Sequence, residues 1–403
     1  MLFRSFAHTY DAVARHVHGE PLPRPTARRP GRVRVGYLSG DLRNHVMGKM
    51  TWAAVEHHDK APFELFFYSL SEADDEWTAR FRGLADHFHS FTHESEREAA
   101  MRIAADDLDL LVDLSTHTKG ARPGILTLKP ARVQITHVAS AGTVGLSTID
   151  FKLTDRYADM RENQAFQIET LLPMAGCVYP FRHIAAAAEH PFRRAALGIP
   201  AEAVVIGAFV SAMKLSRRCL ASWREVLARI PQARLAFSPV DPAHRGSYSR
   251  LLTAAGITAD RVLFLPQGRN DAENQSRYSL VDFVLDPMPY GGANGTLEAV
   301  DAGVPVVTLQ GKRHSERTSY SILANLGVTE TVATSGTEYT EIAVRLAVDP
   351  AFMRAVRDRI REGLRQSILV DTRAHTRALE GAYIDALEAK APEALSATEP
   401  VDG

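Results

Sequence analysis

Short hydrophobic runs alternate along the chain with longer segments whose apolar residues recur at helical spacing. In the first half the runs are VRVGYLSG, FELFFYSL, LDLLVDLS, VQITHVAS, FKLTD and IETLLP. After about Phe181 the same rhythm starts again with VVIGAFVSA, ARLAFSPV, RVLFLPQG, LVDFVLDP and VPVVTLQG. Apolar runs that alternate with helices are typical of parallel strands buried on both faces. The pattern therefore predicts an α/β fold with two doubly wound, Rossmann-like domains.

Changes in composition set the expected boundaries of these domains. An amphipathic stretch from Phe3 to Val17 predicts a first helix, and the segment PLPRPTARRPGR after it is typical of an extended linker. From about Tyr339 to Leu387 apolar positions keep helical spacing without strand runs, which predicts closing C-terminal helices. The expected parts are 1–31 for the first helix and linker, 32–180 for the N-terminal domain, 181–345 for the C-terminal domain, 346–390 for the closing helices and 391–403 for a disordered tail.

Composition narrows the class of protein. The 403 residues are too many for one ordinary core but suffice for two. Because 47 Lys and Arg residues balance 48 Asp and Glu residues, no long-range field would draw the chain to nucleic acid. No apolar stretch is long enough for a membrane span, and two cysteines cannot build a disulfide framework. We therefore expect a soluble protein of the reducing cytoplasm.

The stretch LVDFVLDPMPYGGANGTLEAVDAGVPVVTLQG in the C-terminal domain carries the strongest chemical signal. An apolar strand is followed by a loop in which Gly291, Gly292 and Gly295 permit a ligand to approach the backbone closely. A helix that starts near Asn294 would point its free N–H groups and the positive end of its dipole at a diphosphate. Glu298, one helical turn later, is placed to accept hydrogen bonds from ribose hydroxyls.

Loops of the N-terminal domain supply candidate acid–base groups. Doubly wound sheets bind ligands outside the carboxyl ends of their strands, so two such domains facing each other would line a cleft. His45 follows the first predicted strand, and His117 follows LDLLVDLS. Either histidine can act as a base toward an acceptor hydroxyl or donate a hydrogen bond to a sugar or phosphate. Asp107 and Asp109 open a strand and are interpreted as structural rather than metal-binding residues.

Several segments in the same order resemble the protein O-GlcNAc transferases, including the bacterial SPINDLY-like members. They are VRVGYLSGDLRNH, DLLVDLSTHTKGARPGILTLKPARVQ, the AGTVG turn with IDFKLTD after it, FVSAMKLS and the glycine-rich stretch, and they run from about Arg32 to about Asp371. The resemblance implies a GT-B fold, with two Rossmann-like domains facing a cleft, and a UDP-sugar as the donor. The helical repeats of the animal enzymes have no counterpart in this sequence, so the resemblance covers the catalytic region.

The resemblance also implies roles for individual residues. Lys214 in FVSAMKLS stands where the family has a lysine that contacts the donor diphosphate, and its compact charge suits the leaving group. Ser211 is expected to offer a hydroxyl to the phosphates or the base. His45 matches a histidine proposed as catalytic in the family, and His117 lies in a segment that lines the same cleft. The AGTVG turn, residues 141–145, is expected to offer backbone N–H groups near the donor sugar.

The expected donor-binding set also includes residues of the glycine-rich loop in the C-terminal domain and residues from neighbouring segments. Its members are Ser211, Gly292, Ala293, Asn294, Gly295, Thr296, Glu298, Asn274 and His314. Two segments depart from the animal enzymes: Ala293, Asn294 and Gly295 stand in place of a His-Thr-Thr run, and Asn274 stands in place of a phosphate-contacting histidine. The Asn-Gly pair instead resembles related bacterial enzymes that glucosylate asparagine in adhesins.

The sequence therefore predicts an inverting glycosyltransferase that moves a sugar, GlcNAc or glucose, from a UDP-sugar to a Ser or Thr hydroxyl of a polypeptide. No metal ion or other cofactor is required by this scheme, because Lys214 and the helix near Asn294 would stabilise the departing diphosphate. Transfer to an asparagine amide remains an alternative on the same scaffold. So do a nucleotide-sugar epimerase, because one fold serves many reactions, and a non-catalytic protein that binds sugar nucleotides.

Overall fold

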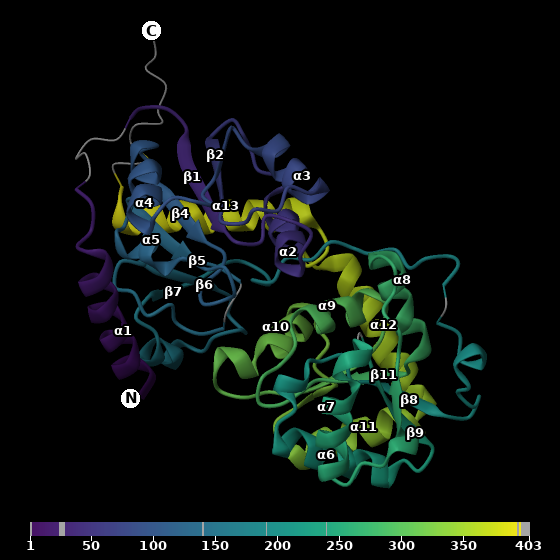
Figure 1. Ribbon diagram of the computed structural model, residues 1–403. Coiled ribbons are helices and arrows are strands. Elements are labelled where there is room, and N and C mark those ends of the chain that lie inside the picture. The colour runs from purple at the N-terminus through teal and green to yellow at the C-terminus, as the bar shows by residue number, and fades with distance from the viewer. Residues whose placement is uncertain are drawn as a thin grey trace. The chain divides into compact units, whose positions relative to one another are not determined.

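The computed structural model describes residues 2–23, 29–138, 141–190, 192–238, 240–392 and 395. Part of the predicted linker, residues 24–28, and most of the predicted tail lie outside the described residues. The chain divides into two compact units. Unit 1 comprises residues 1–182 and 371–403, and unit 2 comprises residues 183–370. Each unit is built around its own parallel sheet (Figure 1), which confirms the predicted α/β class with two doubly wound sheets.

The sheet of unit 1 has seven strands in the order β3-β2-β1-β4-β5-β6-β7, and all neighbours pair in parallel. Its central strands are buried on both faces, as their continuous apolar sequences indicate. The strands are β1 Val33–Ser39, β2 Phe63–Ser69, β3 His87–Ser90, β4 Leu110–Asp113, β5 Val133–Thr136, β6 Phe151–Thr154 and β7 Thr170–Pro173.

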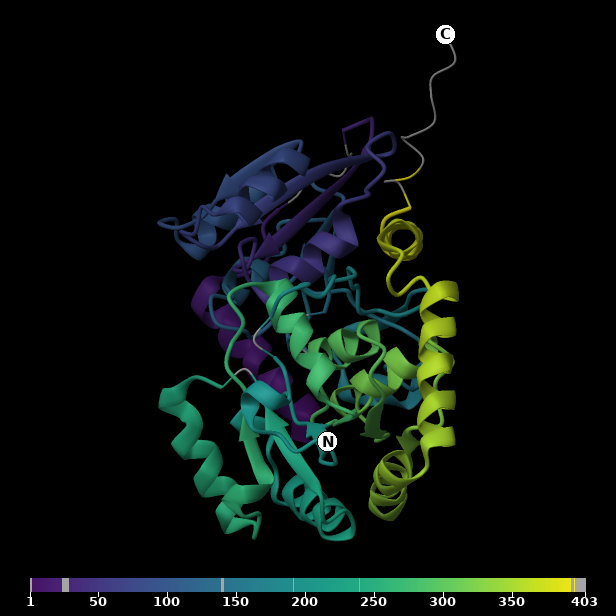
Figure 2. The ribbon, with the colours of Figure 1, turned by 90° about the vertical axis from the view of Figure 1, so that its right-hand side faces the viewer.

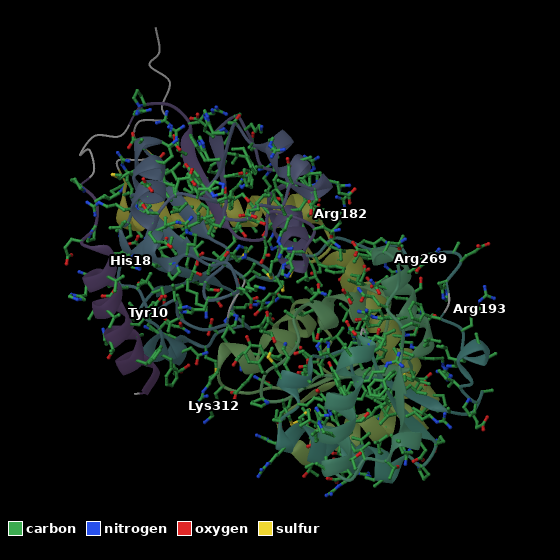
Figure 3. All side chains as sticks on the ribbon, viewed as in Figure 1. Tyr10, His18, Arg182, Arg193, Arg269 and Lys312 are labelled. Atoms are coloured by element: carbon green, nitrogen blue, oxygen red, sulfur yellow. The ribbon has the colours of Figure 1, made fainter. Side chains whose placement is uncertain are left out.

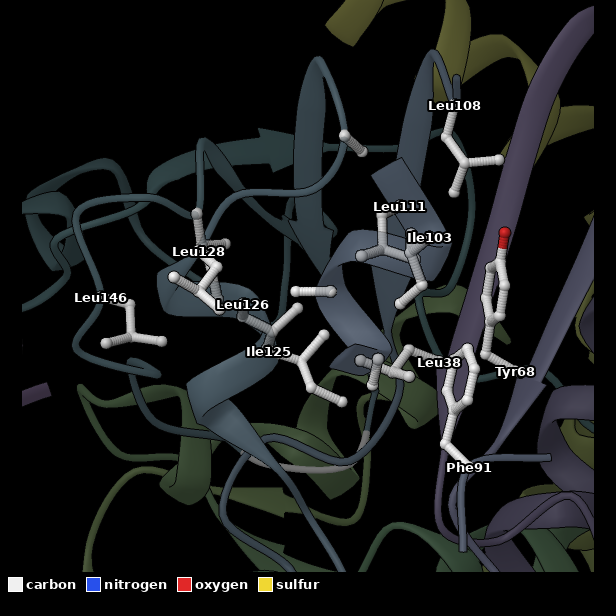
Figure 4. Packing of buried hydrophobic residues seen from close by; sticks show 14 of the residues in the cluster. Leu38, Tyr68, Phe91, Ile103, Leu108, Leu111, Ile125, Leu126, Leu128 and Leu146 are labelled. Carbon is white, nitrogen blue, oxygen red and sulfur yellow. The ribbon is translucent and has the colours of Figure 1, made fainter. Parts of the chain in front are cut away.

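Helices cover this sheet and close its core. On one face a cluster of buried side chains joins Leu38 and Leu111 of the strands to Ile103 and Ile125 of two helices, α4 and α5 (Figure 4). Close packing of this kind is the main source of stability for a parallel sheet. The helices of unit 1 are α1 Leu2–His18, α2 Val46–Val55, α3 Glu76–Leu84, α4 Glu96–Ala105, α5 Pro123–Thr127, the 3-10 helix η1 Arg161–Phe166 and α13 Thr372–Lys390.

The last helix, α13, returns to unit 1 after the chain has completed unit 2 (Figure 2). Its Glu380 carboxylate lies 2.8 Å from His58 Nδ1 and accepts a hydrogen bond from the backbone N–H of Asp59, also at 2.8 Å. One turn earlier, the Thr376 hydroxyl donates to the carbonyl of Ala54 at 2.8 Å. These bonds fix α13 against α2 and the segment that follows it, so the C-terminal helix is an integral part of unit 1.

The sheet of unit 2 has six parallel strands in the order β10-β9-β8-β11-β12-β13. Its strands are β8 Val204–Gly207, β9 Ala233–Phe237, β10 Val262–Phe264, β11 Phe283–Leu285, β12 Val306–Leu309 and β13 Val332–Ala333. The α-helices are α6 Arg217–Arg229, α7 Arg245–Ala254, α8 Asp271–Ser276, α9 Asn294–Asp301, α10 Thr318–Asn325, α11 Gly336–Val348 and α12 Pro350–Gln366. The 3-10 helices are η2 Ala195–Leu197, η3 Ala212–Lys214, η4 Pro242–His244, η5 Ala259–Arg261, η6 Arg277–Leu280 and η7 His314–Glu316.

Both sheets have a topological switch point, where the order of the strands reverses. In unit 1 the chain winds outward from β1 through β2 to β3, and then crosses to β4 on the other side of β1. In unit 2 it winds outward from β8 to β10 and crosses to β11. Loops that leave two neighbouring strands in opposite directions open a crevice at their carboxyl ends, which is where doubly wound sheets bind ligands. The fold thus points to the loops after β1 and β4, and after β8 and β11.

Candidate active site

Lys214 lies at the switch point of unit 2, at the end of η3 in the loop after β8. Its Nζ donates a hydrogen bond of 2.9 Å to the carbonyl of Gly291, in the loop after β11. The same ammonium group lies 4.7 Å from the centroid of the Tyr290 ring, whose side chain is partly exposed. The two switch-point loops therefore meet at this lysine. Burial lowers its pKa, while the nearby Asp286 carboxylate opposes that shift.

Asp286, directly after β11, is the counter-charge to Lys214 and is 4% exposed. Its two oxygens accept hydrogen bonds from the backbone N–H of Gly292, at 2.8 Å, and from the Thr308 hydroxyl, at 2.7 Å. Burial raises the pKa of this carboxyl group, and these hydrogen bonds and Lys214 counteract the rise. Its backbone carbonyl accepts a bond of 2.9 Å from Tyr339 of α11. The aspartate therefore anchors the loop from both sides.

The helix α9 begins at Asn294 with its first-turn N–H groups uncapped by a side chain, because Ala293 stands at the N-cap. The loop before it is held by Ser319, whose hydroxyl donates to the carbonyl of Gly292 at 2.8 Å and also lies 2.8 Å from the Thr296 hydroxyl. Uncapped N–H groups at the positive end of a helix dipole form a site for an anion. Together with Lys214 they give unit 2 the chemistry of a phosphate site.

Glu298, on α9, has a carboxylate that already accepts three hydrogen bonds. Asn294 Nδ2 donates to Oε1 at 2.7 Å, while Arg277 Nη2 and the Tyr278 hydroxyl reach Oε2 at 2.6 and 3.1 Å. The guanidinium of Arg277, which is 5% exposed, also lies 4.9 Å from the centroid of the Phe209 ring. This network holds two side chains in fixed positions: Asn294 at the start of α9 and Glu298 one turn later.

Ser211, Asn274 and His314, which were also predicted for the donor site, lie on three separate segments of unit 2. Ser211 is exposed and precedes η3, in the same loop as Lys214. Asn274 lies on α8, where its side-chain oxygen accepts a hydrogen bond of 2.8 Å from the backbone N–H of Gly268. His314 lies in η7 after β12 and is 7% exposed. Ser211 thus lies on a switch-point loop. Asn274 instead makes a local hydrogen bond, and His314 is buried on another segment.

In unit 1, His45 lines a pocket at the carboxyl ends of the strands β1, β2 and β4. Its Nδ1 accepts a hydrogen bond of 3.3 Å from the backbone N–H of Met47, so the ring caps α2. Because a neutral imidazole that accepts at Nδ1 carries its proton on Nε2, the ring is a hydrogen-bond donor at its other nitrogen. Asp41 Oδ2 lies 3.4 Å from the same Nδ1 and provides a partner when the ring is protonated there.

His117 is not among the described residues that line this pocket. It is exposed in the loop after β4, and its ring packs edge-on against Tyr10 of α1, with centroids 5.6 Å apart. Tyr10 is labelled in Figure 3. The structure therefore gives this histidine a contact with the N-terminal helix.

The AGTVG turn differs from the expectation that it offers N–H groups to a sugar. The N–H groups of Val144 and Gly145 donate to the buried carboxylate of Glu169, at 2.7 and 3.2 Å, and the Thr143 hydroxyl joins them at 2.6 Å. These two N–H groups are already paired, so the expectation was wrong for them. Glu169 lies on the approach to β7, far along the sequence, and spacing alone gives no sign of this pairing.

Sequence reasoning missed several residues that organise these sites. Neither Asp286 nor Arg277 was among the predicted site residues. Asp41 and Arg43 escaped notice beside His45, although the structure joins them by a hydrogen bond of 2.9 Å. A signal existed for Asp286, because it follows an apolar strand directly and precedes a glycine-rich loop. The burial of Arg277 depends on tertiary packing and leaves no mark in the sequence.

Asp107 and Asp109 have structural roles, as expected. Arg132 Nη1 lies 2.6 Å from Asp107, and the backbone N–H of Arg34 donates to Asp109 at 2.9 Å. Among the described residues no three His, Cys, Asp or Glu side chains are grouped so as to hold a metal ion.

Comparison with known proteins identifies relatives over almost the whole chain. The profile of glycosyl transferase family 41 matches residues 12–183 and 187–379. A protein of Arabidopsis thaliana described as a probable UDP-N-acetylglucosamine--peptide N-acetylglucosaminyltransferase SPINDLY is 28% identical over 366 residues, which are 87% of this chain and 39% of the relative. The Arabidopsis protein SEC, with the same description, is 27% identical over 90% of this chain and 38% of its own length. The chain thus spans about two fifths of these curated relatives.

Solved structures of glycosyltransferases also match this chain. A mutant of Thermobaculum terrenum O-GlcNAc transferase matches with a TM-score of 0.84 and 27% identity, over 98% of this chain and 74% of the other. Anabaena HepE, determined with UDP and glucose, matches with a TM-score of 0.57 and 12% identity, over 87% of this chain and 100% of its own, and shows the fold alone. The predicted GT-B class and the resemblance to O-GlcNAc transferases are confirmed.

None of the described helices is both long and apolar enough to span a bilayer.

Proposed function

Because the chain belongs to glycosyl transferase family 41, we propose that it transfers a sugar from a UDP-sugar to a Ser or Thr hydroxyl of a polypeptide, with inversion at the anomeric carbon. GlcNAc and glucose are the proposed sugars. The SPINDLY and SEC relatives, whose descriptions name a UDP-N-acetylglucosamine donor and a peptide acceptor, support this proposal. The observation that carries it is the meeting of Lys214 and the uncapped start of α9 at the switch point of unit 2.

The donor diphosphate would bind beside Lys214 and the first-turn N–H groups of α9. As the bond between the sugar and the diphosphate breaks, negative charge builds on the departing phosphate oxygen. A half-buried ammonium group and fixed N–H dipoles stabilise that charge more strongly than water does, because they are already oriented. Asp286 and Ser319 hold the loop that carries these groups, so they position the site without contacting the donor.

The remaining predicted donor residues surround these two elements. Gly292, Gly295 and Thr296 would let the phosphates approach the backbone, and Ser211 would add a hydroxyl. Glu298 would accept from the ribose with the lone pairs that its three present donors leave open. Asn274 and His314 would contact the outer parts of the donor.

Acceptor chemistry would belong to unit 1. In the tautomer that accepts from Met47, His45 would donate from Nε2 to the reacting groups and so position them. In the other tautomer Nδ1–H would donate to Asp41, and the free Nε2 would take up the proton of the acceptor hydroxyl. His117 would contribute only through its loop. No metal ion enters this scheme, and we propose that the enzyme works in the cytoplasm.

An asparagine amide is the second candidate acceptor, because Asn294 and Gly295 form the Asn-Gly pair that resembles bacterial asparagine glucosyltransferases. Mass spectrometry separates the two. Purified protein is incubated with a panel of UDP-sugars and a cell lysate, with excess EDTA present, and wild type is compared with Lys214→Ala.

We expect a sugar-sized mass on Ser or Thr of lysate peptides with wild type alone, and the added mass identifies the sugar. The same mass on asparagine would favour the second acceptor. If no donor supports transfer while UDP still binds, the transferase proposal is wrong and a binding role replaces it.

A further inference from the structure

The pocket that contains His45 has a volume of about 430 Å³, much more than one imidazole requires. It lies at the switch point of unit 1, where the loops after β1, β2 and β4 converge. The mechanism above uses only His45 and Asp41 of its lining. The lining residues are Gly40, Asp41, Arg43, His45, Leu70, Ser71, Ala73, Thr118, Lys119 and Gly120.

Two cations face this pocket. Arg43 is bonded on one side, where Nη2 donates to Asp41 Oδ1 at 2.9 Å and Nε to the carbonyl of Gly40 at 3.5 Å. Its Nη1 makes no hydrogen bond within the described part of the chain, and its side chain is 37% exposed, against 7% for that of Asp41. Lys119 is exposed and likewise has no partner among the described residues. The pocket thus presents the free edge of a guanidinium that is ion-paired with Asp41, together with the unpaired ammonium group of Lys119.

Asp41 is the one carboxylate in the described lining, and it offsets the charge of Arg43, so the charge of Lys119 remains in excess. Asp41 is buried, and its two oxygens face Arg43 and His45. The loop after β2 carries Asp74 and Asp75, but Asp74 pairs with Arg82 at 3.1 Å and Asp75 caps α3. Neither of these two aspartates lines the pocket, nor does the exposed Glu72 of the same loop. What faces a ligand is therefore a guanidinium edge and an ammonium group.

The other walls limit the size and polarity of the ligand. Gly40 and Gly120 pack so closely that a Cβ atom on Gly40 would lie 3.2 Å from the carbonyl of Gly120, so the loops after β1 and β4 form a continuous floor. Leu70 and Ala73 add apolar surface from the loop after β2. A short aliphatic stem that ends in a carboxylate matches this combination, because the stem can contact Leu70 while the carboxylate meets both cations.

We propose that this pocket binds an acidic side chain, Asp or Glu, of the acceptor polypeptide beside the residue that receives the sugar. The inference rests on the proposed transferase function and names its substrate class. Arg43 offers a planar pair of donors to the carboxylate, and Lys119 adds a second charge from the opposite loop. The acceptor would thus be selected by one carboxylate near the attacking hydroxyl.

The test uses the full chain and synthetic Ser peptides in which Glu replaces Gln at one flanking position at a time. Peptide binding is measured by fluorescence anisotropy, and transfer is measured where it occurs. We expect one position at which Glu improves kcat/KM, or affinity, about tenfold over Gln, as a charged hydrogen bond supplies. Lys119→Glu should abolish that preference and reverse it toward a Lys peptide. Arg97→Glu, an exposed charge reversal on α4 that does not line the pocket, should keep it.

The outcomes separate this proposal from the function on which it rests. If wild type binds Glu and Gln peptides equally at every position, the acidic subsite is wrong, whether or not transfer occurs. If Lys119→Glu weakens binding of UDP, measured by calorimetry, the anion of this pocket is the donor diphosphate, which also overturns the proposal. A Glu preference in the anisotropy assay without any transfer would support the subsite while contradicting the transferase.

Discussion

Lys214 and Asp286 are two charges of opposite sign held at the same edge of the unit 2 sheet, and each depends on the other. Burial alone lowers the pKa of Lys214, and the Asp286 carboxylate raises it again. Replacing Asp286 by Asn removes the charge while leaving a side chain of the same shape. We expect Lys214 then to lose its proton at lower pH, so that the basic limb of the pH profile of kcat/KM for the donor moves to lower pH. At pH 9 kcat/KM should fall about tenfold, as expected for the loss of one charged interaction.

A matched control distinguishes the charge from the hydrogen-bond network. Thr308→Val removes the hydroxyl that donates to Asp286 but keeps the carboxylate. This variant should be less stable and should keep the pH profile of the wild type. A basic limb that stays in place in Asp286→Asn would show that the aspartate does not govern the protonation of Lys214.

At this scale the sequence predicted the positions of residues better than their partners. Lys214 was predicted from the resemblance to the O-GlcNAc transferases, and Asn294 from a helix start that follows an apolar strand and a glycine-rich loop. The partners could not, since Gly291 O, Arg277 and Ser319 come from separate segments that only the folded chain brings together. The Glu169 carboxylate that takes up the N–H groups of Val144 and Gly145 was missed for the same reason.

The loop between β11 and α9 carries the proposed donor site, and two adjacent glycines test its packing. A Cβ atom at Gly291 would lie 2.7 Å from the Thr318 hydroxyl and 3.0 Å from Asp286, whereas at Gly292 the nearest atom is an Asp286 oxygen at 3.4 Å. Gly291→Ala must therefore displace the loop or the side chains of Thr318 and Asp286 that pack on it. We expect it to lower the free energy of unfolding by about 1–3 kcal/mol, as overpacking does, and Gly292→Ala to lower it by less than about 0.5 kcal/mol.

Urea unfolding of both variants measures this difference. Equal stabilities would mean that the loop adapts freely and that its close packing does not hold the site. UDP affinity, measured on the same samples, then reports whether a displaced loop still binds the diphosphate.

Helices and strands with a clear apolar pattern were predicted from the sequence, and strands without such a pattern were not. Every strand predicted from an apolar run is present, because short apolar runs bounded by turn residues favour strands buried in a sheet. β3 and β13 were not predicted: β3 has the polar sequence HFHS and β13 contains two residues, so neither has an apolar run. Helical spacing placed α12 and α13 near the C-terminus, but it cannot tell which sheet a helix packs on.

On the scale of the whole molecule, acid should destabilise unit 1 through two buried histidines. Burial lowers the pKa of His137 to about 4 and that of His375 to about 3, against about 6.5 in an unfolded chain. Between these values the unfolded chain binds more protons, so stability falls as pH falls from about 6.5 to about 4. Asp113 opposes this trend over about pH 4 to 6, because burial raises its pKa to about 6 and the folded state keeps the proton longer.

His375→Gln isolates one of these contributions, since glutamine can still donate to the carbonyl of Cys177, which His375 Nε2 approaches at 3.1 Å. Below pH 6.5 the free energy of unfolding of wild type should fall more steeply than that of the variant, by up to about 1.4 kcal/mol per pH unit. Urea unfolding of unit 1, followed by Trp52 and Trp77 in a Trp223→Phe background, measures both slopes. Parallel slopes would contradict the assignment of a neutral buried His375.

The central claim is that the switch point of unit 2 binds the diphosphate of a sugar nucleotide through Lys214. Titration calorimetry of UDP and uridine against wild type, Lys214→Ala and Arg193→Ala tests it most directly. Arg193, labelled in Figure 3, is the control because it is an exposed cation that precedes β8 in the sequence. We predict that Lys214→Ala weakens UDP by about 10- to 100-fold, the range of a charged hydrogen bond, leaves uridine unchanged, and that Arg193→Ala matches wild type. Equal affinity of wild type and Lys214→Ala for UDP would contradict the account.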